Sequence, residues 1–453
     1  MNKILGIAGL FLVIFLFTTS MSHDFLSANN LQNFLRWTAI FSLLSIGVAF
    51  VIMTGGIDLS IGSVVALSAC VLSSLMTITH YDTPYLCKDA IVSSVDVESN
   101  VVALGYNLPR AEVDDRLVFE GDDGKQRYLT IKTLNRIGNN SEVETAESPK
   151  RLKVGSVISV SEKTYSWSFP TVVIAILLLS AGLGLLHGLL ITKLQIQPFV
   201  VTLCSFLIYR GLARYIALDK PMGFKDRYDS IKHWAQGQTG SIPIPFINYI
   251  SDGHWSGYKI GRDGQQFLEN GKPIPVDLIE WVQIPNPLIV MIIVAIIAAI
   301  FLNRTVFGRY LLALGSNEQA TRFSGIKTDR IKIMAYVICS TLAGLAGMFL
   351  ALDLGTISPS NLGNMYELYA IAGAVLGGCS LRGGEGNIIG VIIGAAVMRL
   401  IYNSINLLGI PSMLEYVVIG LVILGGVMAD ELSRKFAAYR RARQQAAVAS
   451  KPT

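Results

Sequence analysis

NPLIVMIIVAIIAAIFLN, residues 286–303, decides the fold class, because it carries no charged side chain over its whole length. A helix needs roughly 20 apolar residues to cross the hydrocarbon core of a bilayer. Similar apolar stretches recur along the 453 residues, and the charged residues lie in blocks between them. The chain is 52% hydrophobic and 15% charged, with a mean hydropathy of +0.51, whereas soluble domains carry about 25% charged residues. We therefore predict an all-α polytopic membrane protein.

The apolar stretches predict about ten transmembrane helices, arranged in two related halves. They lie at 4–19, 36–54, 60–79, 170–192, 196–216, 286–303, 332–353, 365–381, 386–408 and 412–429. The stretch 365–381 is short and holds Glu367, which favours a broken or half helix. The first stretch also has the basic start and apolar middle of a secretory signal, but it lacks a good small-x-small cleavage site.

Two long polar segments interrupt the apolar stretches and define the domain organisation. Residues 80–169 alternate apolar and polar side chains, as in RLVFEGDDGKQRYLTIKTL (116–134), which predicts a small β-rich insertion. Residues 217–285 are rich in Pro, Gly, Trp and Tyr and predict an irregular insertion with short hairpins. The chain is therefore expected to begin with helices 1–3 in 1–79, followed by the first insertion and then by helices 4 and 5 in 170–216. After the second insertion come helices 6–10 in 286–430 and a basic tail in 431–453.

The positions of Lys and Arg predict the orientation in the membrane. The loop 304–332 and the tail 431–453 are rich in both residues, whereas the loop 354–364 contains neither. Short loops rich in Lys and Arg stay in the cytoplasm. We therefore expect both termini and the loop 304–332 to be cytoplasmic, and both insertions to be external.

Two glycine-rich segments suggest that the halves are repeats. TGGIDLSIGSVVAL (54–67) and LGGCSLRGGEGNIIGVIIGAAV (376–397) each place Gly-Gly, a short polar link and a glycine-rich helix between two apolar stretches. Transporters are often built from repeated halves with the substrate path at the junction. Glycine-rich turns between helices also look alike without any repeat, so this interpretation stays open.

Polar residues in or beside the apolar stretches are the candidates for a substrate pathway. A charged side chain at the middle of a membrane helix costs about 3 kcal/mol, so such residues usually face a cavity or a partner. The candidates are Asp58, Ser60, Glu367, Arg399, Asn403 and Asn406. Two structural alternatives stay open. Asp58 could instead cap the helix that begins near Ser60, and Arg399 and Glu367 could form an ion pair with each other.

The segment GRYLLALGSNEQATRFSGIKTDRIKI, residues 308–333, predicts a compact helical loop. It begins as a helix, then has a Gly-Ser-Asn-Glu turn in which Ser316 or Asn317 could cap a short second helix, and ends at Ser324 and Gly325. Such a loop on the cytoplasmic side suits docking on another protein. An ordinary basic loop that only fixes the orientation explains the same residues.

These segments resemble the ribose/xylose/galactose-type permease family of ABC transporters, a family of binding-protein-dependent inner-membrane components. The resemblance rests on TGGIDLSIGS (54–63), QPFVVTLCSFLIYRGLA (197–213), residues 308–332, residues 366–395 and NSINLLGI (403–410), which occur in the right order. As a whole it covers about 290 of the 453 residues. Three positions depart from the family pattern. Tyr369 stands where an acidic residue is usual, Ser404 where Gly is often found, and Arg399 where an apolar or small residue is common.

The resemblance implies a permease subunit in the bacterial inner membrane that forms the path for a monosaccharide. Its expected partners are a separate ABC ATPase, a periplasmic sugar-binding protein, a second permease copy or paralogue, and membrane lipid. The expected ATPase-coupling residues are Gly315, Ser316, Asn317, Glu318, Ala320, Ser324 and Gly325.

Other functions find less support in the sequence. There is no GxxxxGK[ST] motif, and the five His are dispersed, so we expect no ATPase or other enzyme activity, no cofactor and no metal site. The charge of +5 is modest, and nothing indicates nucleic-acid binding. The alternatives are a branched-chain amino acid or nucleoside permease of the same superfamily, an ion-coupled secondary transporter, and a membrane-anchored sensor.

Overall fold

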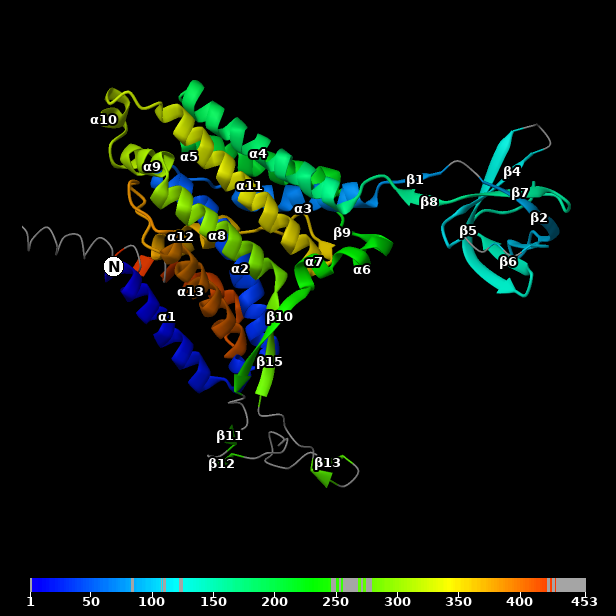
Figure 1. Cartoon of the computed structure of the whole chain (residues 1–453), viewed down its shortest axis with the longest axis horizontal. Helices are drawn as coiled ribbons and strands as arrows, with labels where there is room; N and C mark the ends of the chain where they lie inside the picture. Colours follow the sequence, from blue (N-terminus) through cyan, green and yellow to red (C-terminus); the bar gives the residue numbers. More distant parts are fainter. Residues whose placement is uncertain are drawn as a thin grey trace, which may run out of the picture. The chain divides into compact units, whose positions relative to one another are not determined.

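The computed structural model describes residues 2–82, 85–106, 108, 111–121, 125–245, 250–251, 254–255, 268–269, 272–273, 279–421, 424–425 and 428 (Figure 1). The chain divides into two compact units. One comprises Met1–Ser73 with Val173–Thr453, and the other is Ser74–Val172.

The first unit is a helical bundle. Its main helices are α1 (Asn2–Met21), α2 (Ala28–Met53), α3 (Ile61–Thr77), α4 (Phe169–Lys193), α5 (Pro198–Ile216), α8 (Asn286–Arg304), α11 (Thr328–Leu354), α12 (Tyr366–Leu376) and α13 (Ile388–Leu407). Six of the described helices, namely α2, α4, α5, α8, α11 and α13, are long and apolar enough to cross a membrane. The prediction of a helical membrane protein is therefore confirmed.

The total of ten spans remains a prediction. In α1 the described apolar part is Leu5–Met21, and α3 is also shorter than the long helices. Within the last expected span, 412–429, the structure describes a 3-10 turn, η3 (Ser412–Leu414), and helical backbone at 415–421, 424–425 and 428, while residues 422–423, 426–427 and 429 lie outside the described residues. The basic tail 431–453 lies wholly outside them.

Helix α12 has only 11 residues, so it is a half helix, as its sequence predicted. At 1.5 Å per residue it covers roughly half of a bilayer core about 30 Å thick. It follows a loop in which Met365 and Gly363 both have positive φ. It ends at Gly377 and leads through a glycine-rich link to α13.

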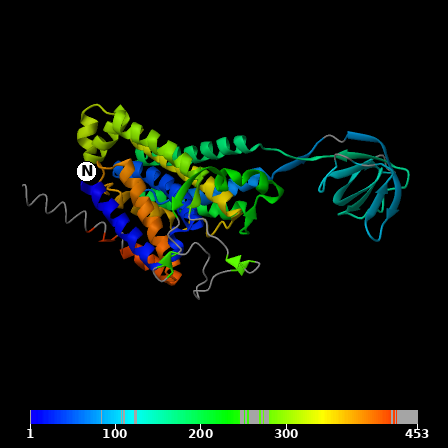
Figure 2. The ribbon, with the colours of Figure 1, turned by 60° about the horizontal axis from the view of Figure 1, so that its bottom comes forward.

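Helix α2 forms the centre of the bundle. In its apolar window 83% of residues are buried, against 22% in α4 and 28% in α5 and α8. It packs against α8, α11, α12 and α13, while α1 lies along α13 (Figures 1 and 2). The exposed apolar faces of α4, α5 and α8 suit contact with lipid, because lipid provides the apolar surroundings that water does not.

Glycines let three loops meet at one end of the bundle. The backbone N–H of Gly384 donates to the carbonyl of Met53 at 2.9 Å, which ties the link before α13 to the end of α2. A Cβ atom on Gly315 would lie 1.9 Å from that carbonyl and 2.3 Å from the Gly384 nitrogen. We call Gly55, Gly315, Gly383 and Gly384 the glycine cluster. A side chain at Gly315 would force these backbones apart.

The second insertion folds in part against the bundle. Strand β9 (Met222–Gly223) pairs with β16 (Thr356–Ile357), and β10 (Gln238–Pro245) pairs with β15 (Ile279–Pro285). Between β9 and β10 in the sequence lie η2 (Lys225–Arg227), α6 (Tyr228–Ile231) and α7 (His233–Gln236). Two two-residue pairs follow, β11 (Ile250–Ser251) with β12 (His254–Trp255) and β13 (Leu268–Glu269) with β14 (Lys272–Pro273). Most of 246–278 lies outside the described residues.

The second unit is a closed antiparallel barrel in the order β2-β3-β6-β5-β4-β7. Its strands are β2 (Tyr85–Asp96), β3 (Val101–Leu104), β4 (Arg116–Glu120), β5 (Gln126–Ile137), β6 (Asn140–Thr145) and β7 (Val157–Ser161). Alternate residues such as Val102 and Leu104 on β3 point inward, which gives the barrel its own apolar core. Strands β1 (Thr79–Tyr81) and β8 (Lys163–Tyr165) pair with each other at its entrance and exit.

Gly188→Ala should destabilise the bundle, because a Cβ there would lie 2.6 Å from the Cα of Ile333 on α11. Overpacking of this kind costs about 1–3 kcal/mol. Gly182→Ala on the same helix meets no atom within 4 Å and serves as the matched control. It should be neutral or stabilise by up to about 1 kcal/mol, since Ala favours helix over Gly. Thermal unfolding of the purified chain in detergent measures both, and equal shifts would contradict the packing of α4 on α11.

Candidate functional site

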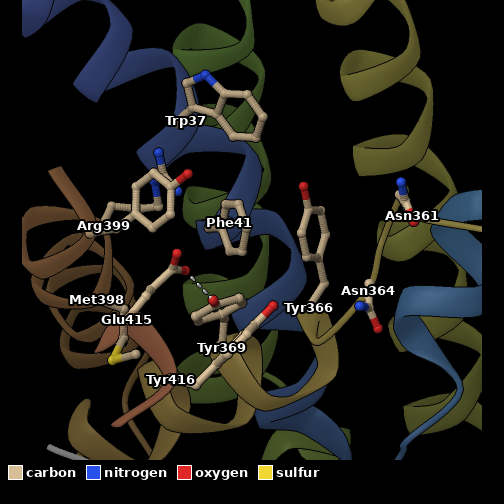
Figure 3. A pocket seen from close by; sticks show the side chains of 11 residues that line it. Trp37, Phe41, Asn361, Asn364, Tyr366, Tyr369, Met398, Arg399, Glu415 and Tyr416 are labelled. Carbon is tan, nitrogen blue, oxygen red and sulfur yellow. Dashed lines mark hydrogen bonds between the residues drawn. The ribbon is translucent and has the colours of Figure 1, made fainter. Parts of the chain in front are cut away.

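A partly open cavity of about 580 Å³ is formed by the helical bundle, with Asn361, Asn364 and Tyr416 exposed at its edge (Figure 3). Helices α2, α12 and α13, the loop before α12 and the residues after η3 supply its walls. Its lining residues are Trp37, Phe41, Asn361, Asn364, Tyr366, Tyr369, Met398, Arg399, Tyr402, Glu415 and Tyr416. Phenols and amides dominate this lining, so the cavity combines aromatic faces with many hydrogen-bonding groups.

Arg399 lies against aromatic rings in this cavity. Its guanidinium carbon is 4.4 Å from the ring centroid of Tyr402, 5.0 Å from that of Trp37 and 5.1 Å from that of Phe41. Aromatic faces attract a cation, and the attraction is stronger away from water. The buried Nε has no hydrogen-bond partner. Stacking therefore holds the guanidinium faces and leaves its other N–H groups available to a ligand.

Arg399 and Glu367 do not form an ion pair. Among the described residues, no carboxylate oxygen lies within 4.0 Å of the Arg399 guanidinium. Glu367 is in the first turn of α12, is 7% exposed, and lies beside Gly62 of α3, where a Cβ would be 2.4 Å from its Oε2. The pairing considered from sequence is therefore wrong, because the two side chains face different surroundings.

Glu415 is the second charged residue of the cavity. The Tyr369 hydroxyl donates a hydrogen bond to Glu415 Oε1 at 2.6 Å (Figure 3). From the sequence, Glu415 counts among the polar residues beside the last apolar stretches, but it was given little weight as a residue of the external interface. Two features of the sequence point to a role for Glu415 in the cavity. Glu415 is a carboxylate beside an apolar stretch, and Tyr369, which contacts it, departs from the family pattern.

Asn403 and Asn406 line a second hollow of about 270 Å³ beside the first. The two hollows share Trp37, Arg399 and Tyr402. Asn403 Nδ2 donates to Asn30 Oδ1 on α2 at 2.9 Å, while its own Oδ1 is buried without a partner. The structure thus brings together three of the residues expected in the pathway, Arg399, Asn403 and Asn406.

Asp58 and Ser60 line neither hollow. Asp58 is fully buried, and its Oδ1 accepts hydrogen bonds from the Ser60 N–H at 2.9 Å and hydroxyl at 2.6 Å, directly before α3. This geometry supports the helix-start alternative. Asp58 Oδ2 has no hydrogen-bond partner and lies 4.0 Å from Nδ1 of His187, whose Nε2 is 3.0 Å from the Tyr209 hydroxyl.

The loop 304–332 contains two short helices, α9 (Val306–Ser316) and α10 (Glu318–Phe323). Asn317 caps α10, because its side chain accepts from the Ala320 N–H at 2.9 Å. Of the two caps considered from sequence, Asn317 is therefore the correct one. The stop after α10 is also confirmed, since Ser324 is its C-cap and Gly325 follows with a φ of +80°.

Glu318 ties this loop to the start of α11. Lys332 Nζ donates to both of its carboxylate oxygens at 2.7 Å. On the same short helix, the side chain of Phe323 is 90% exposed. Val306, Phe307 and Tyr310 of α9 are exposed as well. Exposed aromatic and apolar side chains of this kind are typical of a docking surface.

The described residues contain no group of three or more His, Cys, Asp and Glu that could hold a metal ion.

Comparisons with known proteins place these features in a family. A family model described as "Branched-chain amino acid transport system / permease component" matches residues 30–427. The ribose import permease protein of Escherichia coli strain K12 is 28% identical over 421 residues, covering 92% of this chain and 91% of that protein. Its counterpart from Bacillus subtilis strain 168 is 29% identical over 432 residues, covering 95% and 93%. The xylose transport system permease protein of Escherichia coli strain K12 is 24% identical over 453 residues, covering 95% and 91%. No solved structure matches the chain.

Asp58→Asn should leave the chain nearly as stable as the unchanged protein, within about 1 kcal/mol, because the amide oxygen still accepts from Ser60. Asp58→Leu leaves the Ser60 N–H and hydroxyl buried without this acceptor and should cost about 1–3 kcal/mol for each. Thermal unfolding of both variants in detergent tests this. If Asn destabilises as much as Leu, then α3 requires the charge of Asp58 rather than its acceptor oxygen.

Proposed function

The chain belongs to the family of sugar permeases of ABC importers, and we propose that it forms the transmembrane path for a monosaccharide while a separate subunit hydrolyses ATP. The observation that carries this function is the match of curated sugar permeases over more than nine-tenths of this chain. Those relatives are transport subunits rather than enzymes, and this chain likewise catalyses no reaction.

The cavity is the candidate path. A sugar cannot cross a lipid core unaided, because each unpaired hydroxyl costs several kcal/mol there. The two adjoining hollows offer hydrogen-bonding groups on Arg399, Asn403 and Asn406 between apolar helices. Asp58, Ser60 and Glu367 then shape the path indirectly, by fixing the start of α3 and the half helix α12.

The loop 304–332 is the proposed coupling element, with Gly315, Ser316, Asn317, Glu318, Ala320, Ser324 and Gly325 on its two helices and their flanks. Glu318 fastens α10 to α11, so force on α10 reaches a long membrane helix. At the glycine cluster, the end of α9 touches the end of α2 and the link before α13. Both α2 and α13 line the cavity, so motion of the loop reaches its walls.

The partners follow from this function. Relatives named as import permeases imply an ABC ATPase and an external binding protein. We infer that the ATPase docks on the loop 304–332 in the cytoplasm, that both termini are cytoplasmic, and that a second copy or paralogue completes the path in the inner membrane, surrounded by lipid. The insertions 80–169 and 217–285 would then be external and extend the surface for the binding protein.

The alternatives are weaker. A branched-chain amino acid or nucleoside permease would share the bundle, but the three relatives described above, which match over nearly the whole chain, are named for ribose and xylose. An ion-coupled secondary transporter would leave the capped, aromatic-tipped loop 304–332 without a role.

Purification of the tagged chain from its own cells should retain an ATPase subunit, and Phe323→Ala should reduce the retained amount at least about tenfold, as expected for loss of an aromatic hot spot. Ile137→Ala is the matched control, since Ile137 is 64% exposed in the barrel unit. Immunoblotting or mass spectrometry of the eluate measures retention. A chain that moves sugar after reconstitution with no ATPase present would contradict the proposed function.

A further inference from the structure

The cavity holds two opposite charges that do not pair. Arg399 and Glu415 both line it, yet their charged atoms are more than 4.0 Å apart. Figure 3 shows both on the same side of the cavity, with Tyr366, Asn361 and Asn364 across the open space. Neither the guanidinium nor the carboxylate contacts the other, so each keeps hydrogen-bonding capacity for a third group.

These charges cancel within the cavity. Among the lining residues, Arg399 is the one cation and Glu415 the one carboxylate. Coulomb interactions strengthen as the dielectric falls, so a partly buried site disfavours an added net charge beside a like charge. A neutral ligand leaves the balance intact. A sugar acid or sugar phosphate adds a negative charge beside Glu415.

The donor and acceptor pattern suits a polyol. A guanidinium only donates hydrogen bonds and a carboxylate only accepts them. Each sugar hydroxyl does both, so neighbouring hydroxyls can accept from Arg399 and donate to Glu415 at the same time. Asn361, Asn364 and the Tyr366 hydroxyl offer further donors and acceptors on the other side.

An amino acid zwitterion would also be neutral overall, and its two charged groups could meet Arg399 and Glu415. The remaining lining argues against it. Met398 is the one aliphatic side chain among the lining residues, whereas a branched apolar side chain would need an aliphatic wall.

We propose, on the premise of the proposed function, that Arg399 and Glu415 jointly bind neighbouring hydroxyls of an uncharged sugar in this cavity. Together they exclude sugar acids and sugar phosphates. Tyr369 is the positioning residue, because its hydroxyl holds the Glu415 carboxylate in place.

The test is ligand-induced thermal stabilisation of the purified full chain in nanodiscs, without the binding protein, so that only the cavity selects. The probes are D-ribose, D-xylose, D-ribonate, D-ribose 5-phosphate and L-leucine. A ligand that binds the folded state raises the unfolding temperature with its concentration. We expect stabilisation by ribose or xylose, with the two anions and leucine at least about tenfold weaker, which is the scale of one lost hydrogen bond to a charged group.

Two variants sharpen the test. Arg399→Gln should weaken the binding of the neutral sugar about tenfold. Glu415→Gln leaves the cation unopposed and should let ribonate bind better than ribose, a gain that misfolding cannot produce. Lys150→Gln, an exposed charge change in the barrel unit, should alter neither preference.

The proposal is overturned if an anion or leucine stabilises the unchanged chain as well as the sugars do. It is also overturned if no sugar stabilises the chain, or if Glu415→Gln leaves the order of probes unchanged. The proposed function stands or falls separately. If these binding experiments fail but the whole transporter still takes up sugar in an ATP-dependent way, only the present inference is contradicted. If the whole transporter takes up no sugar, both the inference and the proposed function are contradicted.

Discussion

Close contact between backbones at the glycine cluster is the constraint on which the rest of the bundle depends. The Met53 carbonyl accepts from the Gly384 N–H at 2.9 Å, and Gly315 fits against both because it has no Cβ. Gly383 and Gly384 also have φ angles of +86° and +78°, which L residues with a side chain rarely adopt. This contact sets where the loop 304–332 lies relative to the central helix and to the link before α13. It therefore connects a surface suited to a partner with the helices that line the cavity.

The cavity shows how an apolar bundle tolerates a charged side chain. Arg399 is stabilised by three aromatic rings rather than by a carboxylate. The half helix α12 contributes Tyr366 and Tyr369 to the lining, and its early end leaves room for the glycine-rich link. Irregular backbone is tolerated at membrane depth where protein or a cavity surrounds it. The early end of α12 thus contributes both to the cavity and, through the glycine-rich link, to the connection between the cavity and the loop 304–332.

Much of the fold could be predicted from sequence, because long uncharged stretches and cap residues act locally. The stretch 286–303 became α8, the short stretch at Glu367 became a half helix, and Asn317 capped α10. The site was harder, since membrane position alone does not tell which way a polar side chain faces. Arg399 and Glu367 are both on helices that meet, yet they point into different surroundings. From the sequence Glu415 was given little weight as a residue of the external interface, because nothing in the sequence indicates its contact with Tyr369, which is 46 positions away.

Sidedness of the loop 304–332 tests the account most directly. A Phe323→Cys variant that also carries Cys87→Ser, in the insertion proposed to be external, and Cys204→Ser, which removes an exposed thiol of the bundle, can be labelled with a membrane-impermeant maleimide. The account predicts no labelling of Cys at position 323 in intact cells with permeable outer membranes, and full labelling in inverted inner-membrane vesicles. Labelling from outside intact cells would place the loop on the wrong face of the membrane, and the link between an ATPase, the glycine cluster and the cavity would be contradicted.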